Sequence, residues 1–184
     1  MSRFLSSFPI VESAELADTD KWITSELDKL VKDCKVGFDQ YNFFIPATAI
    51  REFTWNIFAP QYIEMAKARA YGIGFSDAER DGAIYTLHKV LSTLLKLLAP
   101  ITPYITDYLW QTLYSDKSIH TEQQVKEESN DDLTKHTQAI SEFNSKVWNE
   151  KKEKGLSLKD SIKIDIPKDL EIFKKDLVAM HNLG

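Results

Sequence analysis

The stretch that decides the fold is residues 76–104, which read SDAERDGAIYTLHKVLSTLLKLLAPITPY. It opens with a capping box, in which the Ser76 and Glu79 side chains each satisfy a free backbone N–H of a helix's first turn. Apolar residues follow at helical intervals on one wide face, namely Ile84, Leu87, Val90, Leu91, Leu94, Leu95 and Leu98. The helix ends before the first proline, and Thr102 with Pro103 predicts the cap and first residue of another helix.

Further helices lie on either side of this stretch. One runs from Asp18 to Tyr41, with Asp18 or Thr19 as its cap. Another begins near Pro46, and Pro60 predicts a kink at the Ala59–Pro60 step, because proline removes a ladder hydrogen bond and clashes with the preceding turn. In the helix that follows Thr102, the spacing predicts that the apolar and aromatic residues are buried, namely Tyr104, Ile105, Tyr108, Leu109 and Leu113.

The C-terminal third has a different pattern. Residues 121–132 are polar and acidic, which predicts a linker or loop and a domain boundary. A helix then continues to Lys154, residues 161–166 alternate polar and apolar residues as a half-buried strand does, and a last helix covers residues 169–180. The predicted fold is therefore mostly α: a helical bundle over 1–120, and a small α+β appendage of helix, strand and helix over 133–184. The strand has no obvious partner within the chain.

Composition narrows the function. The chain has 6 Gly and 6 Pro in 184 residues, which favours helices over short strands and turns. Its formal net charge of -5 counts against nucleic-acid binding, although screening within about 8 to 10 Å permits a local basic surface on an acidic protein. Cys34 is the single cysteine, which excludes an internal disulfide. Without a signal peptide or a membrane span, we expect a soluble cytoplasmic protein that has no membrane partner.

No motif in the sequence indicates a reaction. It has no Gly-rich phosphate loop, no His and Cys at metal-ligand spacing, and no Ser, His and Asp arrangement. We therefore assign no catalytic, cofactor-binding or metal-binding residue. His88 is interpreted as a boundary histidine of a leucine-rich helix, and Cys34 as a small buried hydrophobe.

One cluster has the composition of an RNA-binding surface. Arg51 and Trp55 are four residues apart and share a helix face, and Tyr62, Lys67 and Arg69 follow on the next segment. Aromatic faces stack on unpaired bases while cationic groups contact phosphates. The alternative is that Trp55 lies in the core and the cations only neutralise neighbouring glutamates.

With these residues the sequence resembles the anticodon-binding domain of valyl-tRNA synthetases, which are class I aminoacyl-tRNA synthetases. The resemblance covers nearly the whole chain and rests on four stretches, 20–27, 49–67, 94–110 and 154–159. The third is shared with the enzymes for related amino acids, and the second is closer to the valyl branch. Residues 179–182 resemble the tail of the archaeal-type enzyme, and residues 2–4 the end of a helix that leaves the catalytic domain.

The resemblance implies binding to valine-accepting tRNA and contact with the catalytic domain of a parent enzyme. From the resemblance we expect six residues on the RNA face, namely Arg3, Arg51, Trp55, Tyr62, Lys67 and Arg69. The two ATP-site signatures of class I synthetases are absent, so the ATP of the intact enzyme implies no cofactor here, and whether this chain is an enzyme stays open. The Ala59–Pro60 step departs from the family pattern, which has acidic or aromatic residues there.

Three questions are open at this point. The first is whether the chain is a fragment of a longer synthetase, which the unpaired strand favours, or a free-standing relative. The second is whether it corresponds to a valyl enzyme or to an isoleucyl- or leucyl-tRNA synthetase. The third is whether it is instead a helical module that binds another protein, a role that suits its negative charge.

Overall fold

The capped stretch forms α5 (Asp77–Leu98), a helix of 22 residues. The Ser76 hydroxyl accepts a hydrogen bond from the Glu79 backbone N–H at 3.3 Å, and the Glu79 carboxylate accepts one from the Ser76 N–H at 2.9 Å. The predicted capping box is therefore confirmed. The buried leucines of α5 pack into the core together with Trp22 and Ile23 of α2 (Asp18–Asp39).

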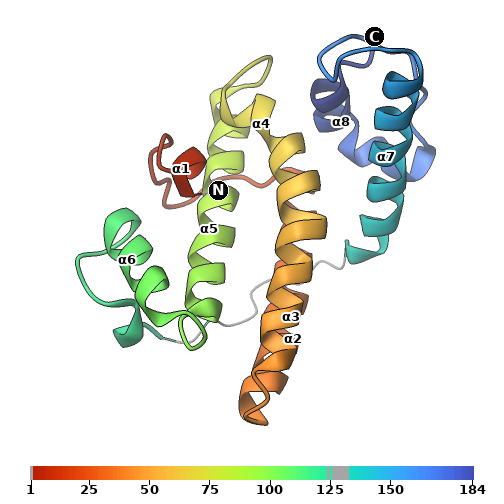
Figure 1. Ribbon diagram of the computed structural model, residues 1–184. Coiled ribbons are helices and arrows are strands. Elements are labelled where there is room, and N and C mark those ends of the chain that lie inside the picture. The colour runs from red at the N-terminus through yellow and green to blue at the C-terminus, as the bar shows by residue number, and fades with distance from the viewer. Residues whose placement is uncertain (1, 124, 126–132) are drawn as a thin grey trace.

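The computed structural model describes residues 2–123, 125 and 133–184, and at residues 2 and 3 it describes no side chain. In this part of the chain the fold is a bundle of helices (Figure 1). The other elements are α1 (Ser2–Leu5), α3 (Phe44–Glu52), η1 (Phe53–Ile63), α4 (Glu64–Ala70), α6 (Pro103–Leu113), η2 (Ile119–Thr121), η3 (Thr134–His136), α7 (Thr137–Glu153), η4 (Lys168–Phe173) and α8 (Lys174–His181). The predicted helical fold is confirmed.

The α2–α3 turn forms one end of the bundle (Figure 1). The two helices come together closely at Gly37, where an added Cβ would lie 2.5 Å from Cδ of Pro46. Any larger residue would therefore push α3 away from α2. This contact fixes the direction in which α3 leaves the turn.

Proline 60 produces a π-helix where the sequence predicted a kink. α3, η1 and α4 follow one another directly, and η1 is a π-helix with Pro60 inside it. The wider π-helix suits a residue that lacks an N–H and whose ring would clash with an α-helical turn. Its buried aromatic rings lie nearly parallel, with Phe53 6.0 Å from Phe58 and Phe58 5.9 Å from Tyr62.

One prediction about α6 needs correction. Tyr104, Ile105 and Tyr108 were expected in the core, but they are exposed, Tyr104 to 91%. The buried residues of α6 are Thr106 and Trp110, and the predicted Leu109 and Leu113 are half-buried against the core, so the packed face is shifted around the helix from the one predicted. The physical reason is that α6 has apolar or aromatic residues on both sides, and spacing alone does not say which side meets α5.

The predicted strand of the appendage is absent. Among the described residues the only β-pairing is a single parallel bridge between Ile162 and Leu183. The alternation is nevertheless real, since Ile162 is buried, Ile164 and Ile166 are half-buried, and the residues between them are exposed. A segment with one bridge has no neighbour along its length, and it therefore stays extended without forming a sheet.

The predicted domain boundary stays a prediction. Most of the acidic segment 121–132 lies outside the described residues. The two parts on either side of it are nevertheless packed together, because α8 contacts α4 and α7 contacts η1. Figure 1 shows α7 and α8 at the end of the molecule away from the α2–α3 turn.

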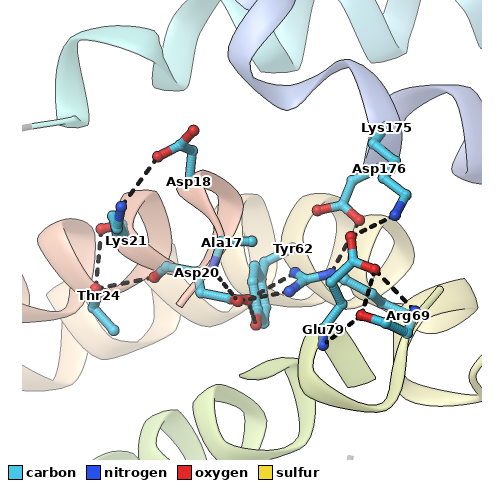
Figure 2. Close-up of polar contacts among 11 residues, drawn as sticks. Ala17, Asp18, Asp20, Lys21, Thr24, Tyr62, Arg69, Glu79, Lys175 and Asp176 are labelled. Carbon is cyan, nitrogen blue, oxygen red and sulfur yellow. Dashed lines mark hydrogen bonds and ion pairs between the residues drawn. The ribbon is translucent and has the colours of Figure 1, made fainter. Parts of the chain in front are cut away.

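A buried arginine connects α2, α4 and α8 (Figure 2). Arg69 is 1% exposed, and its Nη1 and Nη2 donate to the Asp20 carboxylate at 2.6 and 2.7 Å. Its Nε donates to Asp176 at 3.0 Å, and the Tyr62 hydroxyl donates to Asp20 at 2.6 Å. Asp20 also accepts the Ala17 N–H in the first turn of α2, so Ala17 is the cap residue in place of the predicted Asp18 or Thr19. A helix N-terminus stabilises such a carboxylate.

Burial and ion pairing shift the pKa values of Arg69 and Asp176 in opposite directions. Burial lowers the pKa of Arg69, but hydrogen bonds and the charge of Asp20 outweigh it and hold that pKa above its usual value. Burial raises the pKa of Asp176, and the Arg69 charge offsets only part of that rise. The two carboxylates therefore depend on one guanidinium.

A second buried polar group joins η1 to α7 and the C-terminus. The Asn144 side-chain amide donates to Gln61 at 2.6 Å, and its oxygen lies 2.7 Å from Nε2 of His181. Since an amide oxygen only accepts, Nε2 carries the hydrogen. Lys151 donates to the backbone oxygens of His181 and Leu158 at 2.8 and 2.7 Å. We call Gln61, Asn144, His181 and Lys151 the polar column.

The substitution Arg69→Met tests the buried ion pairs. It leaves Asp20 and Asp176 buried without their cation, and we expect the free energy of unfolding to fall by about 3–5 kcal/mol. Urea denaturation measures this loss. Lys67→Met on the same helix removes a partly exposed cation and serves as the control, with an expected change below about 1 kcal/mol. Equal midpoints for the two variants would contradict the assignment.

The stability of the fold should also depend on His181. Burial, with a contribution from the Lys151 charge, lowers the pKa of His181 from 6.5 to about 4. Between these values the unfolded chain binds a proton that the folded chain does not, so stability rises with pH across this window. The shift corresponds to at most about 3 kcal/mol. We expect the free energy of unfolding to fall more steeply from pH 6.5 to 4 in the wild type than in His181→Gln. Parallel pH profiles would exclude this role.

Candidate nucleic-acid interface

Exposed aromatic side chains flank an arginine along the outer face of α3 and η1. Phe44 and Trp55 are 77% and 75% exposed, and Arg51 between them is also exposed. The spacings of seven and four residues place them on one helix face. Tyr41, in the α2–α3 turn just before α3, is 86% exposed. We call Tyr41, Phe44, Arg51 and Trp55 the aromatic stripe.

The backbone of the α2–α3 turn is strained at Tyr41. Its φ is +54°, in the left-handed region that a bulky side chain rarely occupies. Such a conformation costs roughly 1–2 kcal/mol. The turn is supported by the Asn42 side chain, which accepts the Phe44 N–H at 3.2 Å. An aromatic ring held in strained backbone and left exposed indicates a functional site more than a stabilising one.

A cavity lies beside the same turn. It has a volume of about 490 Å³ and lies between the end of α2, the end of α5 and the residues around η2. Its apolar walls include Phe38, Phe43, Leu97 and Pro100, and Tyr41 also lines it. We call this space the tip cavity.

The charges around the stripe are mixed. Arg51 contacts the neighbouring Glu52 at 2.7 Å, with both side chains more than half exposed. On α2, Lys29, Lys32 and Lys35 are exposed at intervals of three residues, and Lys35 pairs with Asp39 at 2.7 Å. Exposed pairs of this kind contribute little energy, so a phosphate competes well for the cations. Exposed Asp33 also lies on α2, so cations and carboxylates alternate along this helix.

The structure separates the six residues predicted for the RNA face. Arg51 and Trp55 lie together on the exposed stripe. Lys67 is half-buried on α4, where it pairs with Glu64, and it lies twelve residues after Trp55 in the sequence. Arg3 lies in α1, and its side chain is outside the described part of the chain.

Tyr62 and Arg69 were wrongly placed on the RNA face. Both are buried in the Asp20 cluster, with exposures of 0% and 1%. Burial and the Asp20 charge also raise the pKa of Tyr62 far above its usual value, as expected of a phenol enclosed beside a carboxylate. Neither side chain has a surface that could meet RNA.

Sequence reasoning missed three residues at the turn, Tyr41, Phe43 and Phe44. All three are exposed, but Tyr41 was predicted as the last residue of the first helix, and Phe43 and Phe44 fell between that helix and the one near Pro46. A signal was available, because three aromatic residues within a four-residue turn exceed what a turn needs for packing.

The described residues contain no group of three or more His, Cys, Asp or Glu that is placed to hold a metal ion. His88 is buried beside the Tyr114 hydroxyl at 3.1 Å, and burial lowers its pKa. Burial raises the pKa of Cys34 to about 12, so its thiol is no nucleophile. Cys34 is thus buried, as was expected, and His88 has a neighbouring partner at its Nδ1. No described helix is both long and apolar enough to cross a membrane.

Comparison with known proteins gives a consistent picture. Residues 20–166 match the family model described as the anticodon-binding domain of tRNA ligase. A valine–tRNA ligase of Nanoarchaeum equitans is 34% identical over 184 residues, which is all of this chain and 24% of that protein. One of Pyrobaculum aerophilum is 35% identical over 170 residues, 88% of this chain and 21% of that protein. One of Ehrlichia ruminantium is 38% identical over 121 residues, 65% of this chain and 15% of that protein.

These matches agree with the helical bundle. The chain spans about a quarter or less of the length of these relatives. The family model covers most of the chain, including the helices that carry the stripe and Arg69, but it ends before α8 with Asp176. The chain therefore belongs to the family of anticodon-binding domains of tRNA ligases.

Proposed function

We propose that this chain is the anticodon-binding region of a valine–tRNA ligase and that its aromatic stripe holds the anticodon loop of valine-accepting tRNA. The observation that carries the proposal is the exposure of Tyr41, Phe44 and Trp55 around Arg51 on one face. A protein does not leave large aromatic side chains in water for the sake of stability. The names of the relatives, which are valine–tRNA ligases, indicate valine as the amino acid.

Base stacking and phosphate contacts have different roles on this face. Unpaired bases stack on the exposed rings, and each stacked base contributes about 1–3 kcal/mol. Arg51 and the lysines of α2 contact the backbone, which sets the position of the loop. The tip cavity has apolar walls for the flat faces of a base and a polar rim, including His120 and Gln123, for its edges.

The chemistry of aminoacylation belongs, in this proposal, to other parts of a longer enzyme. That enzyme would use ATP to join valine to its tRNA in the cytoplasm, and this chain would contact its catalytic domain. The support for this is the share of the relatives' length that the chain leaves uncovered. The chain's own contribution is to hold and select the tRNA.

Binding of the isolated chain to transcribed tRNAs tests the proposal. We expect a tRNA with a valine anticodon to bind more tightly than the same tRNA with an isoleucine or leucine anticodon. Trp55→Ala should weaken binding by about 1–3 kcal/mol, the contribution of one stacked base. Tyr104→Ala removes an equally exposed ring from α6 and should have no effect. Equal losses for the two variants would remove the stripe from the RNA site.

The salt dependence of tRNA binding in the same assay tests whether Arg51 contacts a phosphate. Arg51→Gln should weaken binding and reduce the slope of log affinity against log salt by about 0.7–0.9, the value for one phosphate contact. Glu52→Gln should strengthen binding, because it removes the carboxylate that competes for Arg51. If neither variant changes affinity or slope, Arg51 contacts no phosphate.

A second candidate function has one observation in its favour. The outer face of α6 exposes Tyr104, Ile105 and Tyr108, and the helix contains no lysine or arginine. An aromatic surface without cations is typical of protein interfaces more than of RNA contacts. This face is a candidate for contact with the catalytic domain of the parent enzyme.

A further inference from the structure

The polar column contacts η1, the helix that carries Trp55 of the aromatic stripe. The stripe begins in the turn and in α3, but Trp55 belongs to the π-helix η1. Gln61 lies near the other end of η1 and is 6% exposed. The Asn144 amide that bonds Gln61 comes from α7, in the appendage.

A π-helix needs support of this kind. Each backbone hydrogen bond in it spans five residues, and π-helical segments in proteins are usually short and occur at functional sites. η1 covers 11 residues, and Pro60 supplies no N–H to it. If the segment tightened to α-helical winding, residues five apart would no longer lie on one face. The buried pair Phe53 and Phe58, which stack at an angle of 9°, would then separate.

Both ends of η1 must be fixed for its outer face to keep one direction. At the first end, Ile50 of α3 and Phe53 are buried in the core. At the other end, Gln61 and Tyr62 are bonded to Asn144 and to Asp20. Tyr62 is thereby linked through Asp20 and Arg69 to α8, so the appendage holds this end through two buried routes.

We propose that Asn144 and His181 are positioning residues, which hold η1 in π-helical register so that Trp55 faces outward for RNA. The His181 Nε2–H fixes the Asn144 amide so that its NH₂ points to Gln61. Lys151 in turn holds the backbone of His181. The appendage thus shapes the RNA face without touching RNA, an inference that rests on the proposed function of the stripe.

The variant Gln61→Met tests this proposal in the full chain. Methionine has the length of glutamine and keeps the packing, but it accepts no bond from Asn144. We expect faster amide hydrogen exchange at residues 53–63, a shifted indole N–H resonance of Trp55, and roughly tenfold weaker tRNA binding, the loss expected for one displaced stacking ring. The salt slope should not change, because no phosphate contact is removed.

Three further variants make the result specific. Gln138→Met, on the exposed face of α7, is the matched control and should change none of these measurements. Gln61→Glu keeps an acceptor of the same length for Asn144 and should restore the wild-type resonance and affinity. Asn144→Ser repeats the test from the appendage side and decides the matter if Gln61→Met does not fold.

The outcomes separate this proposal from the function on which it rests. Unchanged exchange and an unchanged Trp55 resonance in Gln61→Met would overturn the positioning role, and so would a changed π-helix with wild-type tRNA affinity. If the wild type binds no tRNA at low salt, the proposed function fails. The exchange and resonance data then still decide whether the column holds η1.

Discussion

The structure depends on the buried contact of one guanidinium with two carboxylates. Arg69 pairs with Asp20 at the start of α2 and with Asp176 on α8, and all three are almost completely buried. Because a buried charge without a partner is strongly unfavourable, these elements must dock together or not at all. The contact therefore makes the C-terminal segment part of the bundle, despite the acidic segment that precedes it in sequence. It also places the appendage at the end of the bundle away from the exposed aromatic turn (Figure 1).

The sequence predicted the elements whose signals are local. The capping box of Ser76 and Glu79 lies at the helix start that it controls, and Gly155, with φ of +66°, directly follows the predicted helix end at Lys154. Prediction from the sequence failed where the environment of a residue depends on a partner that is distant in the chain. Asp176 lies 107 residues from Arg69, so nothing near Arg69 shows that its charge is neutralised inside the protein. The prediction of a strand at residues 161–166 failed for a related reason, because a strand needs a neighbouring strand to pair with.

The candidate site was predictable only in part, for the same reason. Arg51 and Trp55 were found because residues four apart share a helix face. Tyr62 and Arg69 were misplaced because the composition suited to binding RNA, cations beside aromatic rings, also suits a buried ion-pair cluster. Tyr41 and Phe44 were missed because aromatic residues are usually in the core, and only the coordinates show their exposure. The π-helix, which sets the direction of Trp55, has no sequence signal beyond Pro60.

The central claim is that the bundle presents one RNA face, at the α2–α3 turn and along α3 and η1, and that the buried arginine cluster at the other end is structural. Amide hydrogen exchange of the whole chain, with and without saturating valine-accepting tRNA, tests it most directly. We predict that tRNA slows exchange at residues 41–56 and leaves α4 and α8 unchanged. Protection confined to α4, α8 or α6, with none at residues 41–56, would contradict it.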